Sequence, residues 1–252
     1  MRSVFDLSGH TALVTGANTG LGQAIAIALA RAGADIVAVS RRDASETRDA
    51  IAAAGRKCWH VAAELDGARG VTELVAAARA HAPTLDILVN NAGTIRRADA
   101  LDVTESDWDA VVDVNLKSAF FLAQAFARSL VARDAGGKIV NIASLLSFQG
   151  GIRVAAYTAS KSGLLGLTRL LANEWAKLGI NVNAIAPGYF ATNNTTALRE
   201  DADRNRAILE RIPAGRWGEP SDLGGAAVFL ASRASDYVHG TVLPVDGGWL
   251  AR

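Results

Sequence analysis

The residue types most able to do chemistry are a serine, a tyrosine and a lysine: Ser144, Tyr157 and Lys161. Tyr157 and Lys161 are four positions apart, so they are neighbours on one face of a helix. A free phenol has a pKa of ~10, and a nearby ammonium lowers that pKa by stabilising the phenolate. Ser144 follows an apolar run that ends at Ala143, so its hydroxyl can stabilise an oxygen on which charge develops. The trio predicts acid–base catalysis at a hydroxyl or carbonyl oxygen, although each residue alone is also an ordinary surface or loop residue.

A glycine-rich turn precedes the first helical segment, with the sequence Thr15-Gly16-Ala17-Asn18-Thr19-Gly20-Leu21-Gly22. Glycines let the backbone turn sharply and approach a pyrophosphate, and the following helix offers free N–H groups and the positive end of its dipole. The spacing is G-x-x-x-G-x-G, whereas the common fingerprint is G-x-G-x-x-G. A plain tight turn between a strand and a helix is the alternative. Three glycines directly after the first strand favour dinucleotide binding.

The end of the second expected strand indicates which dinucleotide binds. A carboxylate there accepts hydrogen bonds from the ribose 2′-hydroxyl of NAD, whereas an arginine accommodates the 2′-phosphate of NADP. The chain has Ser40, Arg41 and Arg42 at this point, and its first acid is Asp43. A hydroxyl and a guanidinium both suit a phosphate, so these residues favour NADP(H). NAD(H) stays possible, because the arginines can be solvated loop cations and an arginine can stack on adenine in either cofactor.

Two kinds of segment alternate along the chain, and they form the scaffold that must position these residues. Short apolar, β-branched runs are typical of strands buried on both faces. The expected strands are Thr11–Thr15, Asp35–Ser40, Leu85–Asn90, Lys138–Ala143, Ile180–Ile185 and Thr241–Val245. The expected helices are Gly22–Ala32, Ala44–Ala54, Gly70–His81, Ser106–Arg133, Tyr157–Leu178 and Ser221–Ala231. This alternation predicts one α/β domain over residues 1–252, a Rossmann-type doubly wound parallel sheet with helices on both faces.

The composition is that of a compact cytoplasmic protein. Lys+Arg total 26 and Asp+Glu total 25, a balance that lacks the basic footprint of a nucleic-acid-binding protein. Cys58 is the only cysteine, which argues against a disulfide framework or a cysteine-rich metal site and fits a reducing compartment. No run approaches the ~18 apolar residues of a membrane span, and the first ten residues lack a secretory apolar region. We therefore expect no nucleic acid, no membrane and no metal, and a small-molecule substrate.

Taken together, the motifs resemble the short-chain dehydrogenase/reductase family over essentially the whole chain. The matching segments are the glycine turn, Asn90-Asn91-Ala92-Gly93, Asn115, Ser144, Tyr157-x-x-x-Lys161, Pro187-Gly188 and Asp246-Gly247-Gly248. The resemblance implies that Tyr157 exchanges a proton with the substrate oxygen, which Ser144 orients. It implies that Lys161 binds the nicotinamide ribose and lowers the pKa of Tyr157, and that Asn115 holds a water that relays protons to Lys161. It also implies a homotetramer, although the apolar helix faces on which its interfaces would rest can equally be internal.

The same resemblance implies a set of cofactor-binding residues around the glycine turn. Asn91, Ala92 and Gly93 line the cofactor, and Thr192 reaches the nicotinamide carboxamide. The full set is Gly16, Asn18, Thr19, Gly20, Leu21, Gly22, Ser40, Arg41, Glu64, Leu65, Asn91, Ala92, Gly93, Tyr157, Lys161, Pro187, Gly188 and Thr192. The chain departs from the family at Glu64-Leu65, where an aspartate more often contacts adenine.

Three further segments resemble the sugar-acid dehydrogenases of this family: Ser147–Val154, Ala186–Thr195 and Ile212–Gly218. They imply a hexonate substrate of the 2-dehydro-3-deoxy-D-gluconate or 2-deoxy-D-gluconate type, and NAD(H) use by some members. A sugar acid needs a cation for its carboxylate and polar groups for its hydroxyls. The expected substrate-binding residues are Arg97, Ser144, Gln149, Arg153, Tyr157 and Asn193. Each arginine has a surface or interface salt bridge as its alternative, and residues 193–211 are either a mobile lid or an exposed helical excursion.

Other functions stay open on the sequence alone. Gluconate 5-dehydrogenases share these segments, and a 3-oxoacyl carrier-protein reductase would use the same fold with a basic surface, which a formal charge of +1 does not favour. A dinucleotide-binding sensor without chemistry is a third alternative, but Asn115, Ser144, Tyr157 and Lys161 are all retained. The sequence therefore predicts an NAD(P)-dependent oxidoreductase that transfers a hydride between the cofactor and a hydroxyl or ketone of a sugar acid.

Overall fold

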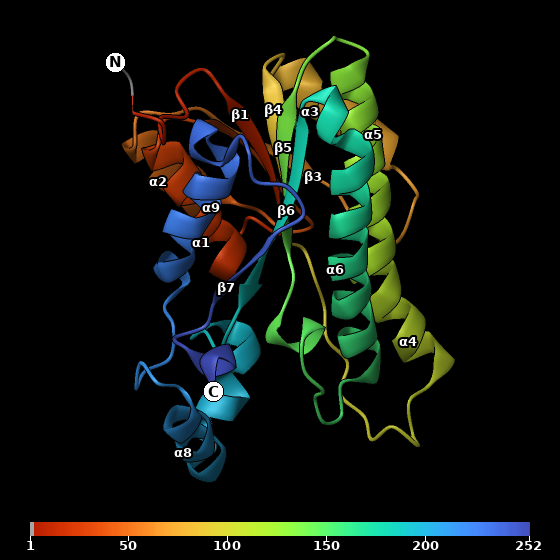
Figure 1. Ribbon diagram of the computed structural model, residues 1–252, viewed down its shortest axis with the longest axis vertical. Coiled ribbons are helices and arrows are strands. Elements are labelled where there is room, and N and C mark those ends of the chain that lie inside the picture. The colour runs from red at the N-terminus through yellow and green to blue at the C-terminus, as the bar shows by residue number, and fades with distance from the viewer. Residues whose placement is uncertain (1–2) are drawn as a thin grey trace.

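Seven parallel strands form one sheet in the computed structural model, which describes residues 3–252 (Figure 1). The strands are β1 (Thr11–Thr15), β2 (Asp35–Ser40), β3 (Cys58–Ala62), β4 (Leu85–Asn90), β5 (Gly137–Ile142), β6 (Ile180–Pro187) and β7 (Val242–Val245). Their order is β3-β2-β1-β4-β5-β6-β7, so the chain runs outward from β1 and then, from β4, in the other direction. This reversal is the switch point of a doubly wound sheet, and it confirms the predicted fold class.

Helices cover both faces of the sheet, with α1, α2 and α9 on one side and α3 to α6 on the other (Figure 1). The helices are α1 (Gly20–Arg31), α2 (Ser45–Ala53), α3 (Val71–His81), α4 (Glu105–Val112), α5 (Ser118–Val131), α6 (Ala155–Trp175), α7 (Thr196–Glu200), α8 (Ala202–Arg211) and α9 (Gly224–Ala231). Two apolar cores result. Ile25 and Leu230 belong to the core under α1 and α9, and Leu74 and Phe126 to the core under α3 and α5.

Two elements differ from the sequence prediction. Strand β3 was not predicted, because its Cys58-Trp59-His60-Val61-Ala62 segment is polar in the middle and only partly buried at the edge of the sheet. Pairing with β2, in the register Ile36↔Cys58, holds it as a strand. The helix expected over 106–133 is two helices, α4 and α5, joined by a π-helical turn, η1 (Asp113–Lys117). Such π turns occur mostly as local bulges at functional sites.

The continuous helical run Glu105–Val131 is, by length and composition alone, apolar enough to cross a membrane. Several of its apolar residues pack inside the protein: Leu122, Phe126 and Leu130 are fully buried in the core under α3 and α5. Core packing therefore accounts for part of the hydropathy of this run, whose most apolar window is 39% buried.

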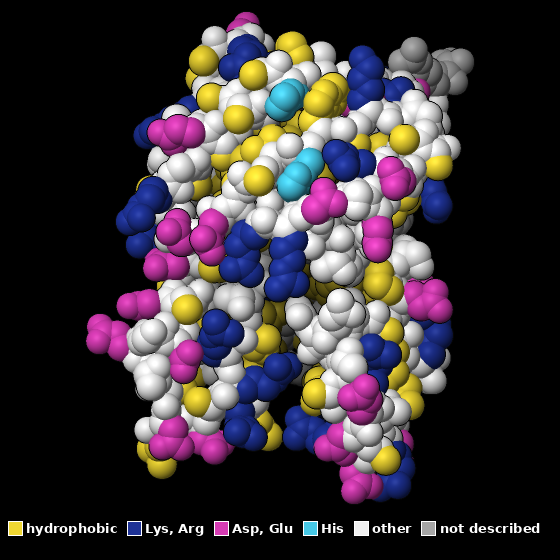
Figure 2. Space-filling view, turned by 180° about the vertical axis from the view of Figure 1, so that it is seen from behind, with side chains coloured by type: hydrophobic (Ala, Val, Ile, Leu, Met, Phe, Trp, Pro, Cys, Tyr) yellow, Lys and Arg dark blue, Asp and Glu magenta, His cyan; other side chains and the backbone are white. Residues whose placement is uncertain are grey.

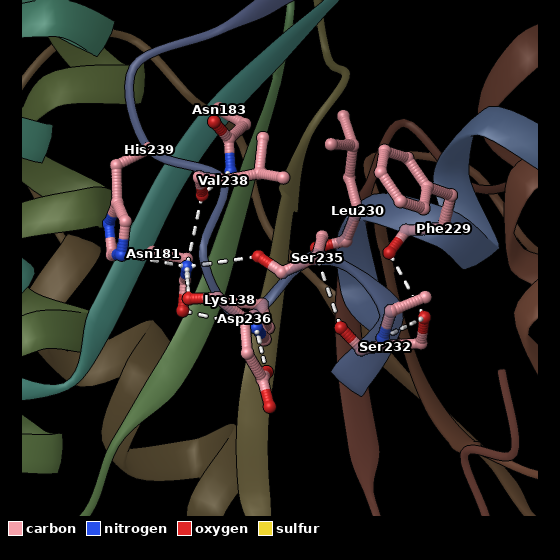
Figure 3. Close-up of polar contacts among 11 residues, drawn as sticks. Lys138, Asn181, Asn183, Phe229, Leu230, Ser232, Ser235, Asp236, Val238 and His239 are labelled. Carbon is pink, nitrogen blue, oxygen red and sulfur yellow. Dashed lines mark hydrogen bonds and ion pairs between the residues drawn. The ribbon is translucent and has the colours of Figure 1, made fainter. Parts of the chain in front are cut away.

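A polar network fixes the entry to β7 at the amino end of the sheet (Figure 3). Asn181, in β6, donates through Nδ2 to the carbonyl oxygens of Asp236 and Val238, each at 3.0 Å. Asn183 donates to the Val238 carbonyl at 2.8 Å, and Lys138 pairs with the Asp236 carboxylate at 2.7 Å. The short edge strand β7 thus starts from a fixed point and delivers the C-terminal segment to the carboxyl edge of the sheet.

Candidate active site

The glycine turn forms a backbone cradle that side chains cannot enter. Gly16 and Gly20 have φ angles of +65° and +58°, in the left-handed region that favours glycine. A Cβ on Gly22 would collide with the Gly16 carbonyl oxygen and with Nδ2 of Asn91. These close approaches leave a bare backbone surface after β1, which fits the pyrophosphate of a dinucleotide.

The start of α1 is free to bind an anion. Thr19 precedes the helix in extended conformation, its side chain makes no cap hydrogen bond, and the first turn contains no acid. The first N–H groups of a helix and the positive end of its dipole favour a phosphate. The residues present therefore fit the dinucleotide that the sequence predicted, with residues 16–22 as its phosphate-binding segment.

Thr15 ties the segment after β4 to the glycine turn. Its Oγ1 accepts hydrogen bonds from the backbone N–H groups of Asn91, at 3.0 Å, and Ala92, at 2.9 Å. The Asn91 side chain donates back to the Thr15 carbonyl at 2.9 Å. Gly93 follows, and a Cβ there would lie 3.2 Å from Oδ1 of Asn115. The predicted residues after β1 and β4 are thereby brought together.

Asn115 is buried in the π turn and joins three parts of the site. Its Oδ1 accepts from the Thr94 N–H at 2.8 Å, and its Nδ2 donates to the Thr94 carbonyl at 2.9 Å and to Ser160 at 3.2 Å. Ser160 in turn donates to the Tyr157 carbonyl at 2.9 Å. Both amide hydrogens of Asn115 are thus used within the protein, so a water relay through this residue would have to use its oxygen atoms.

Ser144 follows the carboxyl end of β5 and Tyr157 lies in the first turn of α6, close enough for the Ser144 hydroxyl to influence the phenol. Burial raises the pKa of Tyr157, while the hydrogen bond with Ser144 and the positive charge of Arg97 act to lower it. Burial is the largest of these influences, so the phenol is protonated at neutral pH. An oxygen bound between Ser144 and Tyr157 would face two hydroxyl groups.

Lys161 is buried one turn further along α6. Its Nζ donates to the carbonyl of Ile142, the last residue of β5, at 2.6 Å and lies 5.7 Å from the centre of the Tyr157 ring. Burial lowers the pKa of Lys161 to about 8. The family resemblance implies that this lysine lowers the tyrosine pKa. Arg97 is a second positive charge that acts to lower the pKa of Tyr157.

Arg97 and Arg153, which were expected to bind substrate, and the neighbouring Arg96 differ in their ion-pair partners. Arg153 has a left-handed backbone, with φ +64°, and its Nε lies 3.3 Å from the Asp99 carboxylate. Arg96 faces Asp107 at 3.6 Å. Arg97 has no ion-pair partner within the described residues 3–252, and its charge acts on Tyr157. Of these three guanidinium groups, that of Arg97 is the one available to a carboxylate.

The segment 193–211, for which the sequence leaves open a mobile lid or an exposed helical excursion, is helical and contacts the C-terminal segment. Arg211, at the end of α8, lies flat over the Trp249 ring at 4.2 Å. Gln149 Oε1 accepts from Arg211 at 3.3 Å and from Trp249 Nε1 at 3.2 Å. The Gln149 oxygen is therefore occupied within the protein, which leaves its NH₂ group for a ligand. Apart from the apolar character of Trp249, nothing in the sequence indicates this contact.

The residues expected at the adenosine end also have protein partners. Ser40 is buried, and its Oγ donates to the Arg42 carbonyl at 2.7 Å and lies 3.0 Å from Nε2 of His60. Arg41 Nη1 pairs with the Glu64 carboxylate at 3.2 Å. His60 was missed by the sequence analysis because β3 was missed.

The remaining predicted residues lie at the same edge. Thr192 lies close to Gly20, where an added Cβ would be 3.8 Å from the Thr192 methyl group. Gly188 packs against Asp246, and Pro187 is buried at the end of β6. Two positions face elsewhere: Leu65 packs against the core under α3 and α5, and Asn193 is exposed at the start of the lid.

The carboxyl edge of the sheet lies between two lobes, one formed by α4 and the start of α6, the other by α7, α8 and the C-terminal segment (Figure 1). Figure 2 shows a hollow between these lobes, with Lys and Arg side chains gathered along its rim. A basic rim raises the local concentration of an anionic ligand.

Comparisons with known proteins agree with this geometry. A family model described as Enoyl-(Acyl carrier protein) reductase matches residues 16–250. The 2-dehydro-3-deoxy-D-gluconate 5-dehydrogenase of Escherichia coli K12 is 59% identical over 250 residues, 99% of each chain. The enzyme of the same name from Bacillus subtilis 168 is 54% identical over 253 residues, 100% of this chain and 99% of the relative.

Among solved structures, a proposed 2-deoxy-D-gluconate 3-dehydrogenase from Agrobacterium tumefaciens with bound NADP is 61% identical. The alignment covers all of both chains with a TM-score of 0.92. The chain belongs to the short-chain dehydrogenase/reductase family. It is an NAD(P)-dependent oxidoreductase that acts on a CH–OH group, which confirms the class of activity predicted from the sequence.

Proposed function

We propose that the protein interconverts a secondary hydroxyl and a ketone on a six-carbon sugar acid of the 2-dehydro-3-deoxy-D-gluconate type. The observation that carries this proposal is the pairing of Ser144 and Tyr157 beside Arg97, the one arginine of the three that has no acidic partner within residues 3–252. The two hydroxyls suit a reacting oxygen, and the guanidinium suits a carboxylate on the same small molecule. The similar enzymes from E. coli and B. subtilis are named for that substrate.

The chain's own residues divide the chemistry between them. When bound, the nicotinamide supplies or accepts the hydride. In the reducing direction, Ser144 holds the substrate carbonyl oxygen, and Tyr157 Oη donates the proton that this oxygen acquires. In the oxidising direction Tyr157 must act as a phenolate, whose Oη accepts the hydroxyl proton; burial opposes formation of this phenolate, and the positive charge of Arg97 favours it. Asn115 and Ser160 hold the α6 backbone, and with it the tyrosine, in place.

For the cofactor we propose NADP(H) as the preferred dinucleotide, with NAD(H) also accepted. Arg41 stands just past β2, where a 2′-phosphate would lie, and the A. tumefaciens structure contains NADP. The phosphate-binding segment, residues 16–22, and the segment 91–93 would hold the pyrophosphate and the nicotinamide side, and Thr192 would close over them. One domain, residues 1–252, would bind both cofactor and substrate.

Initial rates with purified protein test the assignment. Offered 3-deoxy-D-glycero-2,5-hexodiulosonate with NADPH or NADH, the enzyme should oxidise at least one cofactor rapidly. Tyr157→Phe should reduce turnover by about 10²- to 10⁴-fold, the usual contribution of a general acid, while dinucleotide binding is retained. Tyr237→Phe is a matched control, because Tyr237 is fully exposed and lies between Asp236 and Val238 at the amino end of the sheet, opposite the site. Turnover of 3-oxoacyl thioesters in place of sugar acids would contradict the proposed substrate class, and gluconate oxidation would favour a gluconate 5-dehydrogenase.

We also propose a cytoplasmic homotetramer. A groove of about 590 Å³ runs between α5 and α6, lined by Phe120, Leu170 and Leu178 among others. Leu170 and Leu178 are 46% and 43% exposed, and an apolar groove of this kind suits the same helices of a second copy. Light scattering should give four chains per particle, and Leu170→Asp should lower that number without loss of secondary structure. The single cysteine fits a reducing compartment.

A further inference from the structure

The corner of the molecule that would receive the adenosine ribose contains two interactions that oppose a 2′-phosphate. Arg41, the cation expected to bind this phosphate, already faces Glu64 at 3.2 Å. Both side chains are largely exposed, at 72% and 67%, so either can move when a ligand arrives. A dianionic phosphate placed on Arg41 would have to displace the Glu64 carboxylate or lie beside it.

The second interaction concerns the hydroxyl of Ser40. Its single hydrogen is donated to the Arg42 carbonyl at 2.7 Å. The contact with His60 at 3.0 Å therefore has Nε2–H as donor and Ser40 Oγ as acceptor, because a hydroxyl has only one hydrogen to give. Ser40 can then offer a ligand only a lone pair. A lone pair accepts from a ribose hydroxyl and repels a phosphate oxygen.

We infer that Glu64 is a specificity-determining residue that limits the preference for NADP over NAD by neutralising Arg41. This inference rests on the proposed cofactor preference. It adds Glu64 as a residue that acts on the bound cofactor through Arg41. Binding NAD leaves the Arg41–Glu64 pair intact, whereas binding NADP breaks or strains it. Ser40, with its hydrogen fixed by the Arg42 carbonyl and its acceptor role fixed by His60, supports NAD in the same way. Arg41 thus favours binding of the 2′-phosphate, and Glu64 weakens this effect by neutralising Arg41.

The test measures dissociation constants of NADPH and NADH by their fluorescence on titration, without substrate. Glu64→Gln should lower the Kd of NADPH by about three- to tenfold, the size expected for an exposed charge that faces both a guanidinium and a phosphate. The Kd of NADH should stay within about twofold. Asp43→Asn is the matched control: Asp43 lies at the same corner but faces Arg48, at 3.8 Å. An equal effect from Asp43→Asn would reduce the result to a general charge effect and overturn the inference.

A double-mutant cycle separates action through Arg41 from direct repulsion between carboxylate and phosphate. In the Arg41→Gln background, Glu64→Gln should change the NADPH Kd by less than about twofold. A full effect in that background would show that Glu64 acts on the ligand directly, and the inference would be wrong. Unchanged NADPH binding in Glu64→Gln, with wild-type protein that binds both cofactors, would also overturn it but leave the proposed function in place. Failure of the wild-type protein to bind either dinucleotide would overturn both.

Discussion

Replacing Arg97 with glutamine removes the guanidinium that we assign to the substrate carboxylate. Hydrogen bonds to charged groups contribute about 1.5–3 kcal/mol, and each 1.36 kcal/mol corresponds to a factor of ten, so the loss is about 13- to 160-fold in kcat/KM. Arg97 is exposed, which places the expected loss in the lower part of this range. Steady-state kinetics with the sugar acid measures it directly.

The variant Arg153→Gln is the matched control. The Arg153 carbonyl accepts from the N–H of Ala98, next to Arg97, and the Arg153 side chain is already paired with Asp99, so its removal should cost less than about fivefold in kcat/KM. A neutral polyol of the same length gives a second control, because Arg97→Gln should hardly alter the already low activity toward it. The assignment would be refuted by an equal or larger loss in Arg153→Gln, or by an equal fractional loss for acid and polyol.

Arg97→Gln should also move the pH profile of alcohol oxidation. Its charge lowers the pKa of Tyr157, so without it the pKa rises further and the rising limb of kcat/KM shifts to higher pH. A carboxylate-binding residue remote from the tyrosine would leave that limb where it is.

Three shorter predictions concern the cradle, the amino edge of the sheet and the lid. Gly22→Ala should abolish dinucleotide binding and lower the free energy of unfolding by about 1–3 kcal/mol, measured by titration and by urea unfolding, because the added methyl group meets backbone. His10 pairs with Asp86 at 2.6 Å, and this hydrogen bond raises the His10 pKa, with Asp6 adding to it and Lys138 opposing it. The stability that this contact contributes is fully present below pH ~6.5 and is lost as the pH rises through the higher pKa of folded His10. The free energy of unfolding should therefore fall over this pH range by under about 1 kcal/mol. The variant His10→Asn should remove this pH dependence. Arg211→Ala should speed trypsin cleavage of the lid severalfold and raise KM, because the stacking on the C-terminal segment is lost; an unchanged cleavage rate would argue against that contact.

The sequence was sufficient for the parts of the fold that depend on local pattern. Six of the strands could be predicted, because buried parallel strands are continuous apolar runs bounded by glycine or polar residues. Strand β3 could not, because His60 and the half-exposed side chains around it hide the pattern at the sheet edge. The interruption of the long helix at Asn115 was also invisible, since a π turn depends on side-chain contacts, here with Thr94 and Ser160.

At the site, residue types were predictable and their partners were not. The four-residue spacing predicted that Tyr157 and Lys161 lie on one helix face. The glycines of residues 16–22 predicted the backbone cradle after β1. Nothing in the residue pattern indicates that the Ser40 hydrogen is directed at the Arg42 carbonyl, which depends on the local backbone, or that the Gln149 oxygen accepts from Trp249, which depends on where distant segments meet. Residue types alone therefore do not indicate which atoms of a polar side chain are already bound within the protein.

The charge state of the site follows from burial more than from the motif. Desolvation disfavours the charged form of any group, so it raises the pKa of Tyr157 and lowers that of Lys161 to about 8. As the pH rises, Lys161 loses its proton around pH 8, while the buried phenol of Tyr157 still resists ionisation. A lysine that becomes neutral cannot stabilise the phenolate. A guanidinium keeps its charge across this whole range, so Arg97 still supplies a positive charge to Tyr157 at pH values where Lys161 becomes neutral. This is why substrate binding and proton transfer should both respond to the same substitution.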